Sequence, residues 1–454
     1  MGDSGRPGPG AEPGSGPGSG KVTGRKADAT PGVRGAAGAE RGAARTARRR
    51  GGSGGRPADR ALRPGRSLLL LAAGVACFLL ARFASHAPGL VEAVYGARLG
   101  VWIPLALSRL TGWIPFPLGE LLMAALLAAW LWWAGRGAVD VVRGRRRLRN
   151  ALGGAGLRLA ADVGLIVVLF YVLWGFDYAR APLAERLGLP AGTGADTAEI
   201  ARLAREELLA TNAAYRRIHG SDDAGHPTRL ESGPGELREG LEGGWRSAVR
   251  LLDLPDSLLP ARGPVKRFVP DRLLSSFGIS GFFFPWTGEA IVDAGEPALL
   301  LAFDMAHEKA HQRGFAPENE ASFMGWLAAT RSPDPRVAYA GHAVAQLHLV
   351  SVLARTDPER AKALAGERLP GVRRDIRDYA DYLRRTQIRL ATEATTHVND
   401  AYLKANQVPG GVQSYGRVVR LLVSWARAHG GRLEGGGGLR EPATAPAPGG
   451  AGRT

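Results

Sequence analysis

The sequence predicts a mainly α-helical protein, with three N-terminal transmembrane helices followed by a mostly helical domain that contains a small β element. Two observations predict this fold class. Three apolar segments near the N-terminus are each long enough to cross a bilayer. Beyond residue 177, apolar residues recur at the i, i+3, i+4 spacing typical of amphipathic helices. A chain of 454 residues has room for both parts.

The two ends of the chain have the composition of disordered tails. Residues 1–66 contain fourteen Lys or Arg against five Asp or Glu, which is about half of the net charge of +17. They are rich in Gly, Pro and Ser, and residues 431–454 are similar, so neither segment can bury enough apolar surface to fold. Because no aromatic residue is interleaved with the arginines, we expect a basic cytoplasmic tail and no nucleic-acid partner.

A membrane region is predicted over residues 67–176. Its spans are 67–84, 117–135 and 159–176. The third span contains Asp162, whose carboxyl we expect near the interface because it stands close to the start of that segment. The lipid bilayer is therefore the first partner that the sequence implies.

Loop charges set the expected orientation of these spans. The segment 136–158 has seven arginines and one aspartate, whereas 86–116 has only Arg98 and Arg109 as basic residues. By the positive-inside rule, the N-terminus and the 136–158 loop lie in the cytoplasm. The sequence thus predicts a multi-pass cell-membrane protein whose domain, residues 177–430, is extracytoplasmic. We expect the apolar 86–116 segment to lie on the outer membrane surface.

For the domain, the sequence predicts a series of helices and two short extended segments. Helices are expected near 197–217, 235–252, 297–313, 317–331, 335–355, 358–390 and 391–405. The extended segments are 265–269 and 288–293, and the second follows a Gly/Phe-rich turn. It could be an edge strand that pairs with a peptide, or part of an ordinary hairpin.

Two further observations bear on the number of membrane spans and on the possible metal sites. The apolar stretch 337–354 contains two histidines and a glutamine, which favours a buried core helix over a fourth span. Cys77 is the one cysteine of the chain, so neither an intrachain disulfide nor a cysteine-based metal site is possible.

The stretch "AFDMAHEKAHQRGFAPENEASF", residues 302–323, indicates a metal centre. His307 and His311 are four apart, so on a helix both imidazoles can face one ion. Glu308 is adjacent to the first ligand and can accept a proton from a zinc-bound water. An accidental HExxH on a polar helix is the alternative interpretation.

A zinc hydrolase needs a third protein ligand, and two glutamates are candidates. Gly314 can end the first helix and Pro317 can begin a second, which would bring Glu318 or Glu320 back to the histidines. We expect Glu320, because it directly precedes the apolar run of the second helix. Pro317 stands where the long metzincin motif has a third histidine, which also favours a carboxylate.

Supporting residues are less clearly indicated. Asp304 lies one turn before the first histidine and is either a hydrogen-bond acceptor for a ligand imidazole or a solvated carboxylate. Candidates for stabilising an oxyanion are His397, Tyr402 and Tyr415. For each of the three, a hydrogen-bonded core residue is the interpretation that the sequence favours.

Four stretches in order resemble a bacterial membrane family catalogued as domain of unknown function 3810. They are "WGFDYARAPLAERLGL", "GISGFFFPWTGEAIVDA", "AHEKAHQRGFAPENEASF" and "VNDAYLKANQVPGGVQSYGRVVRLL", within roughly residues 67–428. The resemblance implies a zincin-like, gluzincin-type domain with His307, His311 and Glu320 as zinc ligands and Glu308 as general base. Lys309 stands where the family more often has an apolar residue, and we expect it to point to solvent.

The leading functional hypothesis is a membrane-anchored zinc-dependent metallopeptidase. It would hydrolyse peptide bonds of a peptide or protein substrate through a zinc-activated water, with Zn²⁺ as its cofactor. One alternative is a membrane signalling or scaffold protein with a metal-binding but non-hydrolytic domain. Another is a structural protein in which the histidine motif is a relic.

Overall fold

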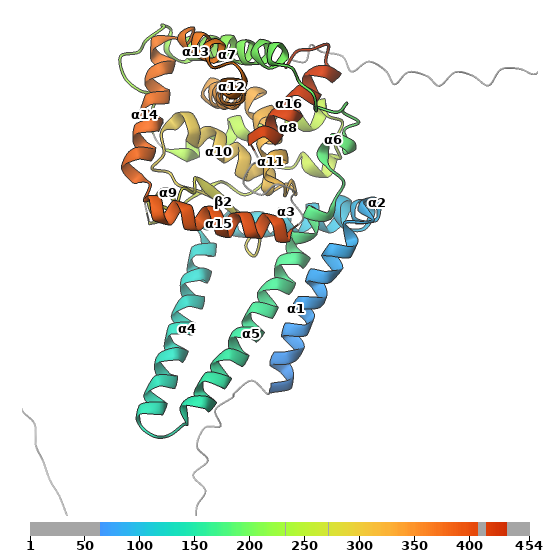
Figure 1. Cartoon of the computed structure of the whole chain (residues 1–454), viewed down its shortest axis with the longest axis vertical. Coiled ribbons are helices and arrows are strands. Elements are labelled where there is room, and N and C mark those ends of the chain that lie inside the picture. Colours follow the sequence, from blue (N-terminus) through green and yellow to red (C-terminus); the bar gives the residue numbers. More distant parts are fainter. Residues whose placement is uncertain (1–63, 232, 271, 407–414, 434–454) are drawn as a thin grey trace, which may run out of the picture. The chain divides into compact units, whose positions relative to one another are not determined.

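The structure is a computed structural model that describes residues 64–433 except 232, 271 and 407–414 (Figure 1). Most of the two predicted tails therefore lies outside the described residues. The N-terminal tail was expected to extend to residue 66, but helix α1 (Pro64–Ala84) already begins at Pro64. The predicted fold class is confirmed, since long apolar helices precede a mainly helical domain with one small sheet.

The three predicted spans correspond to α1, α4 (Leu118–Val142) and α5 (Leu148–Leu173). Their side chains face outward, and only 6% of the most apolar window of α4 is buried. Helices α1 and α5 approach closely where two glycines meet. The backbones are so near that a Cβ on Gly164 would come within 2.4 Å of the Leu70 carbonyl oxygen. Such contacts between small residues are typical of membrane helices.

Asp162 occupies the middle of α5 rather than its beginning. The helix starts at Leu148, eleven residues before the predicted start at 159, so Asp162 is not a terminal residue. Its carboxylate accepts a hydrogen bond from Trp130 Nε1 of α4 at 3.0 Å and lies 3.7 Å from Arg158 Nε. This carboxylate is thus partnered by side chains of α4 and α5.

The segment expected on the membrane surface forms three consecutive helical pieces. They are α2 (Pro88–Val91), the π-helical η1 (Glu92–Leu99) and α3 (Gly100–Thr111). Figure 1 shows α2 and α3 at the level where the domain meets α1 and α5, crosswise to those helices. By length and composition this stretch is also a candidate span.

The domain consists of short and long helices. In chain order they are η2 (Gly175–Ala179), α6 (Leu183–Arg186), α7 (Thr197–His219), η3 (Pro234–Leu237), α8 (Arg238–Leu251), η4 (Asp256–Leu258), α9 (Leu273–Ser276), α10 (Ala298–His311), α11 (Glu318–Thr330), α12 (Pro335–Thr356), α13 (Pro358–Gly366), α14 (Pro370–Thr386), α15 (Arg389–Ala405) and α16 (Tyr415–Ala428). The one helix expected over 358–390 is divided, because Pro370 begins a new helix.

A three-stranded sheet supports α10 from one side. Its strands are β1 (Lys266–Arg267), β2 (Gly281–Phe284) and β3 (Glu289–Val292), in the order β1-β3-β2. The possible edge strand at 288–293 is therefore the central strand. The Gly/Phe-rich stretch expected to be a turn contains β2, which pairs antiparallel with β3 through a tight turn in which Gly288 has φ 67°.

Helix α12 lies in the hydrophobic core. Of the five candidate membrane helices in the described chain it is the most covered, with 61% of its apolar window buried. It packs on α7, α10, α11 and α16, and its own side chains Val337, Ala340 and Leu349 are fully buried. The prediction of a core helix over 337–354 agrees with this packing, which also fixes α10 and α11 in place.

Candidate metal centre

The centre is built on the hairpin of α10 and α11. Helix α10 ends at His311, Gly314 adopts φ 83°, and α11 begins directly after Pro317, at the two positions that the sequence indicated. Gly325 lets the two helices approach, since a Cβ there would lie 3.1 Å from His307 Cα. The end of α10 and the start of α11 are thereby held side by side.

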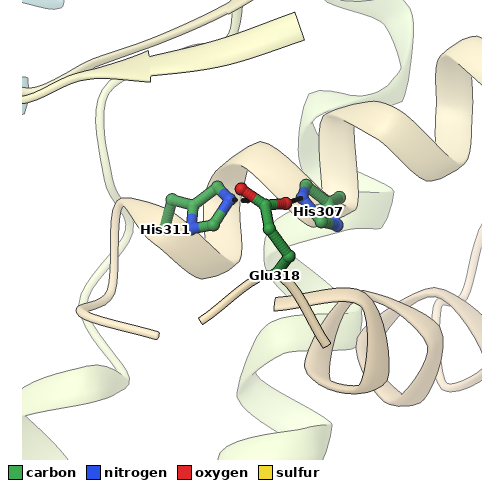
Figure 2. A group of neighbouring side chains, drawn as sticks. All are labelled: His307, His311 and Glu318. Carbon is green, nitrogen blue, oxygen red and sulfur yellow. Dashed lines mark hydrogen bonds and ion pairs between the residues drawn. The ribbon is translucent and has the colours of Figure 1, made fainter. Parts of the chain in front are cut away.

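Two histidines and one glutamate converge at this point (Figure 2). The Oε2 atom of Glu318 lies 3.1 Å from His307 Nε2 and 3.7 Å from His311 Nε2. One donor atom from each of the three side chains lies within 4.8 Å of the others. Two imidazole nitrogens and a carboxylate oxygen are a ligand set that zinc accepts.

The second nitrogen of each imidazole is engaged elsewhere. His311 Nδ1 lies 2.8 Å from the Phe315 carbonyl oxygen, which can only accept, so Nδ1 carries a proton and Nε2 is the nitrogen left to face Glu318. His307 Nδ1 lies 3.2 Å from the Ser322 hydroxyl. Contacts of this kind orient the ring and direct Nε2 toward a metal.

Glu320, the expected third ligand, faces away from the histidines. Its carboxylate accepts hydrogen bonds from Leu183 N and Arg186 Nη2, both at 2.8 Å. Two residues along a helix differ by about 200° in direction, so Glu318 and Glu320 cannot point to the same place. The structure therefore puts Glu318 where the sequence analysis put Glu320.

Glu308 is buried beside the two histidines. Its Oε2 atom has no hydrogen-bond partner in the described part of the chain. Burial raises the pKa of this carboxyl to about 7, although His311 and His307 act in the opposite direction. The side chain passes close to Gly281 of β2, where an added Cβ would be 3.1 Å from Glu308 Cγ.

The charges of the three converging side chains depend on one another. Burial by itself lowers the pKa of His307, but the hydrogen bond and charge of Glu318, with Glu308 and Asp304, raise it to about 9. Burial likewise opposes ionisation of Glu318, yet His311 and His307 hold its pKa well below the usual range. His307 and Glu318 thus form an ion pair. A bound metal would take the place of the proton between them.

Asp304 takes neither of its two expected roles. It is buried, and its carboxyl interacts with the Glu296 carboxyl and with Ser280, whereas the His307 Nδ1 contact is made by Ser322. Burial raises the pKa of both acids, and for Glu296 the neighbouring Asp304 adds to this effect. The two carboxyls therefore form an interacting pair in which burial disfavours ionisation of both acids.

Lys309 does not point to solvent. Its side chain is buried, with Nζ 2.6 Å from Glu242 Oε1 and 3.0 Å from the Gly263 carbonyl oxygen. Arg313 Nη2 contacts the other oxygen of Glu242 at 2.7 Å. Lys309 lies one residue from Glu308, about 100° around the helix, and its charge is neutralised there by Glu242.

Aromatic side chains adjoin the centre on the side of α5 and α15. The Trp174 ring lies 5.7 Å from that of His311, and its Nε1 donates to the His311 carbonyl oxygen at 3.1 Å. Tyr402 donates to the Tyr178 hydroxyl at 3.2 Å. Burial raises the pKa of both tyrosines, and the charge of Glu318 adds to it.

Of the oxyanion candidates whose side chains the structure describes, Tyr402 is the one near Glu318. His397 is exposed on α15, and the side chain of Tyr415 lies outside the described residues. Trp174 and Tyr178 were not predicted as site residues, although both belong to the quoted stretch "WGFDYARAPLAERLGL".

Fold and site together define a mainly helical protein with candidate membrane helices and a His-His-Glu group. The family model described as "Protein of unknown function (DUF3810)" matches residues 95–423, and the chain belongs to this family. No curated protein matches the chain. No solved structure matches it either.

Proposed function

We propose that the protein is a membrane-anchored zinc-dependent metallopeptidase. The observation that carries this proposal is the convergence of His307, His311 and Glu318 within 4.8 Å, beside a buried glutamate with an unpartnered oxygen. The basic segments 1–66 and 136–158 support a cytoplasmic N-terminus and an extracytoplasmic centre.

The residues present fit a zinc ion. His307, His311 and Glu318 would hold it through two nitrogens and one oxygen, with both Nδ1 atoms already engaged by Phe315 and Ser322. A protein ligand count of three is that of catalytic zinc sites, which keep one position open. When bound, the ion supplies Lewis-acid chemistry for a carbonyl oxygen and a water molecule.

Glu308 is the general base of the proposed reaction. It follows His307 directly, lies beside both histidines and leaves one oxygen unpartnered, so it can take a proton from an attacking water. The same carboxyl then gives this proton to the departing amine. Burial keeps bulk water from competing for it.

Strand β2 is suited to position an extended peptide. It pairs with β3 on one side, and its other side has no strand partner in the described chain. At Gly281 one face of β2 lies next to Glu308. A peptide added to the free edge of β2 would extend the sheet that carries this face. The Tyr402 hydroxyl, which donates to Tyr178 in the structure, is the candidate for stabilising the oxyanion and would turn its hydrogen from Tyr178 toward the substrate.

Metal analysis and one substitution test the proposal. Purified protein supplied with zinc should contain about one ion per chain. Glu308→Gln should keep that zinc and lower peptide hydrolysis by about 10²–10⁴-fold. The matched control is Glu239→Gln, an exposed glutamate of α8, which should change neither quantity.

Two results would contradict the proposal. Absence of bound zinc after loading would remove the metal centre, and full activity of Glu308→Gln would remove the base. Stoichiometric zinc without turnover on any peptide would instead favour a signalling or scaffold protein that binds metal without hydrolysis.

A further inference from the structure

The exposed apolar side chains of the domain are not spread evenly. From residue 177 onward, the described chain exposes seven large apolar side chains, and six of them lie in two segments. We call these six the membrane-proximal surface: Val269, Leu273, Phe277, Ile388, Leu390 and Val398. The seventh, Leu209, is on α7, which Figure 1 shows at the end of the domain far from α4 and α5.

Helix α15 is amphipathic with its apolar side uncovered. An exposed apolar stripe recurs every three or four residues: Leu390, Ala394, Val398, Ala401 and Ala405. Leu390 and Val398 expose 78% and 71% of their surface. A helix that packs only on its own domain would turn this stripe inward, so the stripe needs another apolar neighbour.

The membrane-proximal surface is continuous with the candidate spans. At the C-terminal end of α15, Tyr171 of α5 donates to Asn406 Oδ1 at 3.1 Å, and Phe170 of α5 contacts Tyr402 with ring centroids 6.1 Å apart. The backbone N–H of Val269 donates to Glu120, in the first turn of α4, at 3.0 Å. Figure 1 shows α15 crossing the domain-side ends of α4 and α5.

The metal centre borders this same layer. Trp174, which contacts His311, is the residue directly after α5, and its ring lies 5.9 Å from that of Phe170. Behind the histidines, α10 is closed by core residues such as Met305 and Ala310. Glu318 retains 35% exposure of its side chain, so access to the centre lies away from that core.

We propose that the membrane-proximal surface rests in the bilayer interface and that the centre acts on polypeptide segments held there. The substrate class would then be the juxtamembrane segment of a membrane-anchored polypeptide rather than a peptide free in solution. An amphipathic helix with an exposed apolar stripe binds an interface in this way. The substrate class rests on the proposed peptidase function, whereas the docking of α15 does not.

Docking is tested by fluorescence quenching in vesicles of phosphatidylethanolamine and phosphatidylglycerol. Cys77→Ser provides a background without cysteine, and Leu390→Cys, Val398→Cys or Leu209→Cys adds one site for a bimane label. Lipids brominated on their acyl chains should quench the label at 390 and 398 at least twofold and leave 209 unchanged. Equal emission at all three sites, with and without bromine, would overturn docking.

The substrate class is tested with one fluorogenic peptide library in two forms. The first is soluble, and the second carries a C-terminal transmembrane helix in the same vesicles. Turnover per bound zinc should be at least tenfold higher for the anchored form. The double variant Leu390→Glu with Val398→Glu should lose most of that preference while keeping its zinc, and Leu209→Glu should keep it.

The outcomes separate this inference from the function on which it rests. If both forms are cleaved equally and the double variant behaves like the parent, the substrate class is overturned and the peptidase remains. If zinc-loaded protein cleaves neither form, the peptidase and its substrate class both fall. In that case the bromolipid quenching still decides whether α15 docks.

Discussion

Helix α10 and the residues directly after it carry polar side chains on two sides, and the two sides differ in how their charges are compensated. On one side, Lys309 and Arg313 share the two oxygens of Glu242, and Gln312 donates to the Gly288 carbonyl oxygen at 2.9 Å. On the other side, His307, His311 and Glu308 face Glu318, with a carboxylate oxygen of Glu308 unpartnered.

This difference distinguishes a structural cluster from a candidate functional one. Buried polar groups are normally hydrogen-bonded within the chain, and Arg313 also lies over the Trp245 ring, with Cζ 4.6 Å from its centroid. The histidine side keeps nitrogen and oxygen atoms directed at one point. The first side should therefore determine stability, and the second should determine metal binding and catalysis.

The largest expected effect is on the paired side. Glu242→Gln removes the one carboxylate between Lys309 and Arg313 and leaves two buried cations without compensation. We expect a loss of about 3–5 kcal/mol in the free energy of unfolding, measured by denaturant titration in detergent. The exposed Glu239→Gln on the same helix should change it by less than about 0.5 kcal/mol. Equal stability of the two variants would contradict the structural role.

The next largest effect is expected on the affinity for zinc. Glu318→Gln removes the proposed ligand oxygen that faces both histidines, and we expect at least about 100-fold weaker zinc binding, measured by chelator competition. Glu320→Gln is the matched control, because its carboxylate contacts Arg186 and Leu183 instead. Zinc loss in the Glu320 variant with retention in the Glu318 variant would reverse our assignment.

A smaller effect is expected at the contact between β2 and α10. Gly281→Ala places a methyl group 3.1 Å from Glu308 Cγ and 2.8 Å from the Ile291 carbonyl oxygen. Displacing the base by a few tenths of an ångström should lower kcat about tenfold, with zinc content unchanged. Gly278→Ala, in the preceding turn and near Thr392, would control for general strain in this segment. Unchanged kcat would show that Gly281 does not position Glu308.

The smallest effect concerns the orientation of one ligand. Ser322→Ala removes the hydroxyl beside His307 Nδ1 and leaves every proposed ligand in place. Zinc affinity should fall by about tenfold, the lower end of what such partners contribute, and stability should change little. A larger loss than that of Glu318→Gln would mean that Ser322 itself is a ligand.

Much of the fold follows from the sequence because its signals are local. Apolar runs of the right length predicted α1, α4 and α5, and the 3.6-residue period predicted most helices of the domain. The pair His307 and His311 is equally local, since one helical turn puts both on one face. Strand β2 was missed because glycine and three phenylalanines carry no alternation of polar and apolar residues.

The sequence near the two glutamates could not decide whether Glu318 or Glu320 faces the histidines. Both stand in the first turn of α11, and the sequence around them is compatible with either. Arg186 and Leu183, more than 130 positions away in the chain, engage Glu320 and leave Glu318 for the histidines. Lys309 was misplaced for the same reason, since its partner Glu242 comes from α8.

The sequence by itself determined the apolar helices, the histidine pair and the glutamate beside it, because helix periodicity and span length act over a few turns of chain. Only the tertiary structure decided which carboxylate faces the histidines, which charges are neutralised, and that α15 exposes an apolar stripe near α5. Those features depend on packing between distant segments, where burial makes each polar group take the partner that the fold brings to it.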